Sequence, residues 1–524
     1  MKKVEIFDST LRDGAQSEGV SFSVQDKLNI VKALDDFGVT YIEAGNPYSN
    51  PKDMEFFRRL KDFPLKNAKL CAFGSTRRKY SQAERDDNVK ALLDADTPAV
   101  AVFGKSWDLH ISEVLGISKE ENLAMVADTI RYLKEQGKEV IFDAEHFFDG
   151  FKSDPACAME VLRAADEAGA DVLTLCDTNG GTLPSEIYDI TKRVCETFPG
   201  KRVSIHCHND SGCAVANSLL ALEAGAVQVQ GTFIGIGERC GNADLSVIIP
   251  TLTLKRGVEC VAGDISKLTE TVIKLYEISN LVMPTNKPYS GSSAFAHKGG
   301  MHIDGVDKCS RSFEHISPEL VGNSRRYLMS EMSGKATVLS KIKTLAPDLD
   351  KNSPLTKEIL ETIKKLEHEG YQFEAADASF ELIVLNILGR FRPHFELQMY
   401  KTSGEYPRPS GEHSAYAVVN VKVGDKTETA ASLGNGPVNA LDLALRRALS
   451  VFYPMLSEVR LTDYKVRVLS GDSATGATVR VLIENTDGKS VWTTVGVSTD
   501  IIEASRLALV DAMEYYLFKR EAQL

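Results

Sequence analysis

The sequence predicts an α/β protein: an N-terminal (β/α)8 TIM barrel, a helical linker subdomain and a C-terminal α+β domain with an internal duplication. Three observations predict this architecture. Eight short apolar runs alternate with helical segments over the first 256 residues. Polar and charged residues gather directly after these runs. Beyond residue 257 the alternation stops, and further on it gives way to strands followed by single long helices.

Length and composition set the broad class. A chain of 524 residues is too long for one core, and we expect parts spanning residues 1–270, 271–370 and 371–524. With 43% hydrophobic and 26% charged residues, the composition is that of an ordinary globular protein. The net charge of −12, without a basic stripe, argues against nucleic-acid binding.

The chain shows none of the usual targeting patterns. We expect no signal peptide, because the N-terminus enters a strand directly at Val4. We expect no membrane span, because no uncharged apolar run reaches about 18 residues. Nine cysteines without a Cys-x-x-Cys pair indicate reduced thiols and a cytoplasmic protein.

The eight expected strands are short runs rich in apolar and β-branched residues. They are Val4–Leu11, Thr40–Asn46, Lys69–Ser75, Ala99–Gly104, Glu139–Phe147, Val172–Asn179, Arg202–Asn209 and Gln228–Gly235. Helix starts are marked by Ser23, Pro155 and Pro184, and helix ends by Gly38, Gly169 and Gly225. An open doubly wound sheet is the alternative, but it would carry a Gly-x-Gly-x-x-Gly loop after an early strand, and this chain has none.

A barrel places its active site at the carboxyl ends of its strands. His206 and His208 end the seventh strand and project to the same face. With Asp13 after the first strand and Asn242 after the eighth, they form a mixed nitrogen and oxygen set. Such a set leaves open positions on Mg²⁺, Mn²⁺ or Zn²⁺, whereas a structural zinc site would show four Cys/His ligands. Histidines satisfied by hydrogen bonds near a strand end are the alternative.

The same rim carries groups suited to a 2-oxo acid, whose carboxylate and keto oxygens would fill the open metal positions. Arg12 would supply positive charge for a developing alkoxide, and Glu145, across the barrel, would position a base or act as one. A structural ion pair to Glu43 or Asp13 is the alternative role for Arg12.

Three segments together carry a family resemblance: Asp8–Gln16 (DSTLRDGAQ), His206–Asp210 (HCHND) and Gly235–Asn242 (GIGERCGN). They resemble the DRE-TIM metallolyases, a family that includes 2-isopropylmalate, homocitrate and citramalate synthases and 3-hydroxy-3-methylglutaryl-CoA lyase. The resemblance implies a divalent metal on Asp13, His206, His208 and Asn242. It also implies catalytic roles for Arg12 and Glu145, and contact between Thr178 and the 2-oxo acid. Gln16 stands where the family often has an acid, and we expect it to act only as a supporting residue.

The implied reaction is a Claisen-type condensation of acetyl-CoA with pyruvate. Pyruvate carries only a methyl group, and Phe73 and Phe103 at strand ends could fill the space that a larger 2-oxo acid needs. The alternatives are 2-oxoisovalerate, as in 2-isopropylmalate synthase, or 2-oxoglutarate, as in homocitrate synthase. From another class, the chain could be a catalytically silent amino-acid-sensing regulator.

The linker region concentrates histidine and glycine in Ala296–Gly305, which we expect to be a loop. Leu355–Gly370 is expected to be a connecting amphipathic helix. The family resemblance makes His302 a candidate for proton transfer, assisted by Tyr327, in a subdomain that covers the barrel mouth of the partner in a homodimer.

The last 150 residues suggest two copies of a strands-then-helix unit, with a period near 62 residues. The expected helices are Val438–Leu449 and Asp500–Leu517. A dimerisation domain is one interpretation. The segment also resembles the regulatory domain of isopropylmalate and citramalate synthases, which implies isoleucine as an effector that acts through a conformational equilibrium. Gly471–Gly476 is its most family-like stretch.

Overall fold

The computed structural model describes residues 3–49, 51–61, 63–328, 345–347, 349–350, 352–404, 414–469, 476–488 and 490–521. The chain separates into two compact units. One holds the residues up to Phe295 together with His315–Arg325, and the other holds Ala296–Glu314 together with the chain from Arg326 onward. The expected boundaries near residues 270 and 370 stay a prediction. No helix among the described residues is long and apolar enough to span a membrane.

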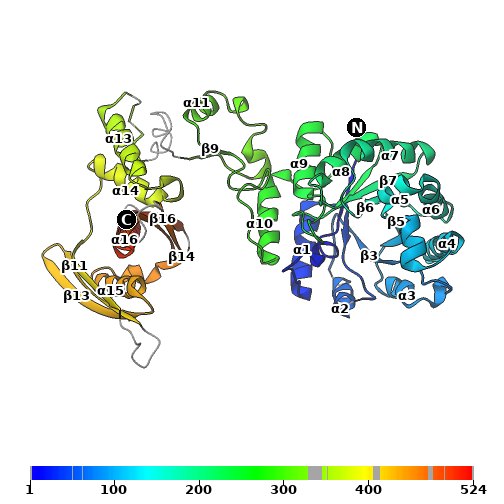
Figure 1. Ribbon diagram of the computed structural model, residues 1–524, viewed down its shortest axis with the longest axis horizontal. Helices are drawn as coiled ribbons and strands as arrows, with labels where there is room; N and C mark the ends of the chain where they lie inside the picture. The colour runs from blue at the N-terminus through cyan, green and yellow to red at the C-terminus, as the bar shows by residue number, and fades with distance from the viewer. Residues whose placement is uncertain are drawn as a thin grey trace. The chain divides into compact units, whose positions relative to one another are not determined.

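The first unit is a closed barrel of eight parallel strands, which confirms the predicted fold class (Figure 1). The strands are β1 Glu5–Asp8, β2 Tyr41–Glu43, β3 Lys69–Ser75, β4 Ala99–Lys105, β5 Glu139–Glu145, β6 Val172–Asp177, β7 Arg202–Cys207 and β8 Gln228–Gly231. Pairing of β1 with β8, in the register Glu5↔Gln228, closes the barrel. All eight strands overlap the predicted runs.

Helices surround the barrel and bury the outer faces of its strands (Figure 1). They are α1 Val24–Phe37, α2 Pro51–Leu60, α3 Asp87–Asp94, α4 Lys119–Glu135, α5 Phe147–Ser153, α6 Pro155–Glu167, α7 Pro184–Thr197, α8 Ala214–Ala224 and α9 Leu245–Arg256, with α10 Leu268–Ile278 following. The predicted helix starts and helix ends are confirmed. Ser23 forms a capping box with Asp26, and Gly38 ends α1 at a φ of 90°.

Strand β1 is shorter than predicted because its side chains pull the backbone into a turn. The Asp8 carboxylate accepts hydrogen bonds from the backbone N–H and the hydroxyl of Thr10, at 2.9 and 3.0 Å. An aspartate that bonds two residues ahead favours a turn over a continued strand. This turn places Arg12 and Asp13 at the mouth of the barrel.

Below the mouth, one layer of the barrel interior is apolar. Phe7 and Tyr41 stack with ring centroids 5.8 Å apart and pack with Cys71, Ile141 and Val172 in one buried cluster. A barrel closed by such a layer is a packed core, not a pore.

The second unit holds the small parallel pair β9 Ala296–His297 and β10 Arg326–Tyr327, with helices α11 Gly300–Lys308, α13 Pro354–His368 and α14 Asp377–Ile387. Helix α13 confirms the expected connecting helix. The expectation of a loop over residues 296–305 is wrong, because α11 forms there. Ile303 and Val306, one turn apart on α11, are both buried, so packing overrides the poor helix propensity of glycine.

The C-terminal part repeats a three-stranded antiparallel sheet and a helix twice, which confirms the predicted duplication. The first copy is β11 Glu396–Gly404, β12 Ala415–Val423, β13 Lys426–Gly434 and α15 Pro437–Ser450; the second is β14 Arg460–Val468, β15 Val479–Thr486, β16 Val491–Ser498 and α16 Ile501–Glu521. The sequence patterns missed β11, a largely exposed edge strand with a register irregularity between Leu397 and Met399. Residues 471–475 of the family-like stretch lie outside the described residues.

Candidate active site

The loops after β7 and β8 are tied together at the barrel mouth. His208 and Asn242 form an isolated antiparallel bridge, and the backbone N–H of Asn209 donates to the carbonyl of Gly241 at 2.9 Å. Gly237 is required here, since a Cβ at this position would lie 1.8 Å from Asn242 Oδ1. The two loops thereby bring Asn242 against the end of the seventh strand.

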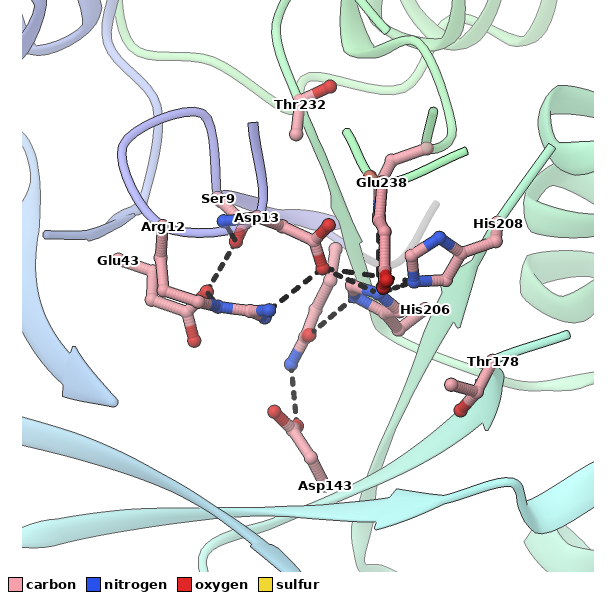
Figure 2. A network of polar contacts seen from close by, with 12 residues as sticks. Ser9, Arg12, Asp13, Glu43, Asp143, Thr178, His206, His208, Thr232 and Glu238 are labelled. Atoms are coloured by element: carbon pink, nitrogen blue, oxygen red, sulfur yellow. Dashed lines mark hydrogen bonds and ion pairs between the residues drawn. The ribbon is translucent and has the colours of Figure 1, made fainter. Parts of the chain in front are cut away.

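Asp13, His206 and His208 converge from β1 and β7 into one buried cluster (Figure 2). His206 Nε2 lies 3.5 Å from Asp13 Oδ2 and 3.4 Å from His208 Nε2, and His208 Nε2 lies 3.8 Å from Asp13 Oδ2. Asn242 Nδ2 lies 3.2 Å from His206 Nε2. Among the described residues, this is the one group of three His, Cys, Asp or Glu side chains whose ligand atoms all lie within 4.8 Å of one another.

The polar atoms of this cluster are not satisfied within the protein. Asp13 Oδ1, Asn242 Oδ1 and His208 Nδ1 are buried and, within the described structure, have no hydrogen-bond partner. The Nε2 atoms of the two histidines also face each other, although both would be acceptors in rings protonated at Nδ1. Buried groups left this way are costly, and a divalent cation that accepts lone pairs from the Asp13 and Asn242 oxygens and from the two facing Nε2 atoms would remove most of the cost. The donor set therefore fits a metal.

Arg12 supplies positive charge beside the cluster. Its Nε donates to Glu43 Oε2 at 2.7 Å and its Nη1 donates to Asp13 Oδ2 at 2.8 Å. Its guanidinium carbon lies 3.9 Å from the centroid of the Phe73 ring. Ser9 Oγ donates to the same Glu43 carboxylate. Arg12 thus makes the ion pairs with Glu43 and Asp13 that a purely structural role would require, and it also borders the cluster of Asp13, His206 and His208.

Burial and charge set the protonation of the cluster. Burial opposes ionisation of Asp13, but the charge of the neighbouring Arg12 guanidinium outweighs it and holds the pKa of Asp13 well below its usual range. Burial, with the neighbouring His206, lowers the pKa of His208 to about 4. His208 is therefore neutral at physiological pH, the form that binds metals. Burial also acts to lower the pKa of His206, but the Asp13 carboxylate outweighs it and raises this pKa.

The remaining predicted barrel residues lie at the ends of neighbouring strands. Glu145 forms an ion pair with Lys105 at the end of β4. Thr178 follows β6, and its Oγ1 accepts a hydrogen bond from the backbone N–H of His146 at 2.9 Å. Phe103 is half-buried and stacks on Phe73 with ring centroids 5.3 Å apart. Phe103 is thereby linked through Phe73 to Arg12.

His302 and Tyr327 belong to the second unit. His302, on α11, is exposed and stacks on Phe313 with centroids 4.3 Å apart. The Tyr327 hydroxyl donates to Asp307 Oδ1, also on α11, at 2.6 Å. The two predicted residues thus share one small subdomain, and their relation to a barrel mouth stays a prediction.

The sequence patterns missed Asp143, Gln230 and Lys105. Asp143 precedes Glu145 by two positions on β5, so both point to the same side of the strand, and this spacing could have revealed it. Burial, with the neighbouring Glu43 carboxylate, raises the pKa of Asp143 to about 6. Gln230, on β8, lies between Asp143 and His206.

The fold and this rim define a class of protein. Residues 3–282 match the HMGL-like family, residues 290–371 match the homocitrate synthase post-HMGL domain-like family, and residues 374–517 match the LeuA allosteric (dimerisation) domain. The chain belongs to the HMGL-like family.

Relatives that align over nearly the whole chain are similar to it at the level of individual enzymes. The chain is 52% identical over 523 residues to the (R)-citramalate synthase of Aquifex aeolicus, an alignment that covers 100% of this chain and 99% of that protein. It is 49% identical to the (R)-citramalate synthase of Geobacter sulfurreducens, with 99% of each chain covered. A probable 2-isopropylmalate synthase of Methanosarcina acetivorans is more distant, at 33% identity over 99% of this chain and 96% of that protein.

Proposed function

We propose that the protein is an (R)-citramalate synthase, an acyltransferase that condenses acetyl-CoA with pyruvate and water to give (R)-citramalate and CoA. The observation that carries the proposal is the buried Asp13, His206 and His208 cluster beside Arg12 at the barrel mouth. The identity of 46–52% to five (R)-citramalate synthases over nearly the full chain supports this choice of substrates.

Asp13, His206, His208 and Asn242 would hold a divalent ion, Mg²⁺, Mn²⁺ or Zn²⁺. Such an ion polarises a carbonyl group and so makes the keto carbon of a 2-oxo acid more electrophilic. Support comes from the unpartnered oxygens of Asp13 and Asn242 and from the neutral ring of His208. The amide of Asn242 can turn to present its oxygen, because amide orientations follow the surrounding partners.

Residues of the chain would stabilise the developing negative charge and transfer protons during the condensation. The methyl group of acetyl-CoA loses a proton and forms a bond to the keto carbon, and the keto oxygen becomes a hydroxyl. Arg12 would stabilise the negative charge that grows on that oxygen. Glu145 would position or act as the base, and its pairing with Lys105 keeps it oriented. Water then hydrolyses the thioester and releases CoA.

Thr178 would bind the carboxylate of pyruvate. Its oxygen already accepts the His146 N–H, so its hydroxyl hydrogen is free to donate to an anion. His302 and Tyr327 would serve proton transfer in the barrel of a partner subunit within a homodimer. The exposed position of His302 and the match to a LeuA dimerisation domain support this arrangement.

A free-CoA release assay tests the proposal. Acetyl-CoA is supplied with pyruvate, 2-oxoisovalerate or 2-oxoglutarate, before and after metal removal with EDTA. We expect CoA release with pyruvate, its loss in EDTA and its return when a divalent metal is restored. Turnover unaffected by EDTA would refute the metal-assisted mechanism. A clear preference for 2-oxoisovalerate or 2-oxoglutarate would assign the chain to 2-isopropylmalate or homocitrate synthesis instead.

Phe103 would limit the size of the 2-oxo acid. In Phe103→Ala we expect the kcat/KM ratio of 2-oxoisovalerate to pyruvate to rise by about 10- to 200-fold, because even one methylene of pocket space is worth about 1–3 kcal/mol. Phe63→Ala, a truncation of a half-buried ring on the outer side of the barrel, is the matched control and should leave the ratio unchanged. An unchanged ratio in Phe103→Ala would remove Phe103 from the pocket.

The C-terminal domain would sense the end product of the pathway, isoleucine, and so place the enzyme in branched-chain amino-acid biosynthesis. We expect isoleucine to inhibit the full-length enzyme and deletion of the chain after residue 370 to abolish the response, since the LeuA match begins at residue 374. Turnover with and without isoleucine measures both. A full-length enzyme that ignores isoleucine and leucine alike would contradict this role.

A further inference from the structure

Gln230 is a buried side chain that links β8 to the strands on both sides of the cluster. It is fully buried, and its Oε1 lies 3.1 Å from His206 Nδ1. Its Nε2 donates to Asp143 Oδ1 on β5 and to Thr174 Oγ1 on β6, each at 3.0 Å. In Figure 2, dashed lines join His206 to Asp143 through one intervening side chain. Gln230 therefore forms polar contacts with three different side chains inside the barrel.

The neighbours determine which way the amide of Gln230 points. Asp143 is a carboxylate above its pKa of about 6, so at neutral pH it only accepts hydrogen bonds. Turning the amide over would set the oxygen of Gln230 against the Asp143 oxygen in a buried site. Such a contact costs the desolvation of two unpaired acceptors. The amide nitrogen therefore faces Asp143, and the amide oxygen faces His206.

The fixed amide oxygen in turn selects the hydrogen position on His206. An oxygen acceptor 3.1 Å from Nδ1 requires that Nδ1 carry a hydrogen. In the neutral ring, Nε2 then keeps its lone pair and points it towards Asp13 and His208. Partners of this kind fix the tautomer and orientation of metal-binding histidines and raise their basicity.

We propose that Gln230 is a positioning residue that holds His206 with its hydrogen on Nδ1, leaving Nε2 for a divalent metal, and that Asp143 acts by orienting Gln230. The inference rests on the proposed function, in which His206 binds the metal. It extends the metal site from the strand ends into the barrel interior, across β5 and β8.

Metal affinity of the metal-free protein tests this inference without reference to turnover. Gln230→Met keeps the length of the side chain but removes the acceptor. Zn²⁺ and Mn²⁺ are titrated into the EDTA-stripped full-length protein in competition with a chromophoric chelator. We expect Kd to rise by about 10- to 100-fold in Gln230→Met, the usual effect of losing such a partner.

Gln228→Met is the matched control. Gln228 lies two residues earlier on β8, is equally buried, and donates to Glu5 at the opposite end of the barrel. Its Kd should equal that of the native chain. Unfolding midpoints of all variants in EDTA separate lost metal affinity from lost folding.

The double variant Gln230→Glu with Asp143→Asn keeps the proposal falsifiable if Gln230→Met folds poorly. It exchanges acid and amide, so the carboxylate introduced on β8 still accepts from His206, and the amide introduced on β5 donates to that carboxylate in turn. We expect native or tighter metal binding. Gln230→Met with native affinity, or the exchanged pair with affinity at least about tenfold weaker, would overturn the positioning role alone. A native chain that binds neither metal would overturn the proposed function as well.

Discussion

Replacing His208 with alanine is expected to lower condensation turnover by at least about a thousandfold. That factor corresponds to about 4 kcal/mol of transition-state stabilisation, within what a metal supplies by polarising a carbonyl. His208 is 5% exposed, neutral at physiological pH and has no partner for Nδ1 among the described residues, so the truncation would remove a proposed ligand without breaking a strong ion pair. Steady-state kinetics with pyruvate and metal analysis of the purified variant measure the effect.

Cys207→Ala is the control for His208→Ala. Cys207 is the preceding residue and ends β7, and its side chain packs in the apolar core outside the barrel interior. Its truncation should preserve both metal content and turnover. If His208→Ala instead retains metal and near-native turnover, His208 is not a ligand, and the site must be built from Asp13, His206 and Asn242.

Arg12→Lys is expected to lower kcat by about a hundred- to a thousandfold, or about 3–4 kcal/mol, with a smaller change in KM for pyruvate. Lysine keeps the charge but is a point donor that lacks the planar fork of arginine. A lysine ammonium cannot bond Glu43 and Asp13 together while its charge lies over the Phe73 ring, as Arg12 does. The charge would therefore lose its fixed place beside the reacting oxygen. Kinetics over a range of pyruvate concentrations separate kcat from KM.

Arg77→Lys provides the matched comparison. Arg77 is also buried and bonds two carboxylates, Glu121 and Asp128, away from the barrel-mouth cluster. Its replacement should lower the midpoint of thermal unfolding and leave turnover near native. If Arg12→Lys lowers turnover no more than Arg77→Lys does, Arg12 serves only as a structural ion pair.

Predictions of regular elements were accurate where the local pattern and the burial agree. The third strand occupies the predicted range, Lys69–Ser75, because its centre, Leu70–Phe73, is apolar and at least half-buried. The predicted strand limits were wrong, or a strand was missed, where a side-chain contact or an exposed edge sets the backbone conformation. The Asp8 carboxylate ends β1 early, and β11 is an exposed edge strand that shows no burial alternation.

In the second unit, helix α11 forms although its local sequence disfavours a helix. Gly299, Gly300 and Gly305 favour a loop, yet α11 forms because Ile303 and Val306 gain burial there. The burial of these two side chains depends on the folded packing around α11, which the spacing of glycines in the sequence does not show. Tertiary packing therefore decided this helix.

The sequence by itself determined that eight strands alternate with helices and that the carboxyl ends of strands carry Arg12, Asp13, His206, His208 and Asn242 on one rim. Those features depend on residues near in the chain and on the rule that parallel strands end together. Only the tertiary structure placed Gln230 between Asp143 and His206, which lie 87 and 24 positions away from it. Barrel closure brings such distant side chains within 3.1 Å, and burial then makes each hydrogen bond determine the orientation of the next.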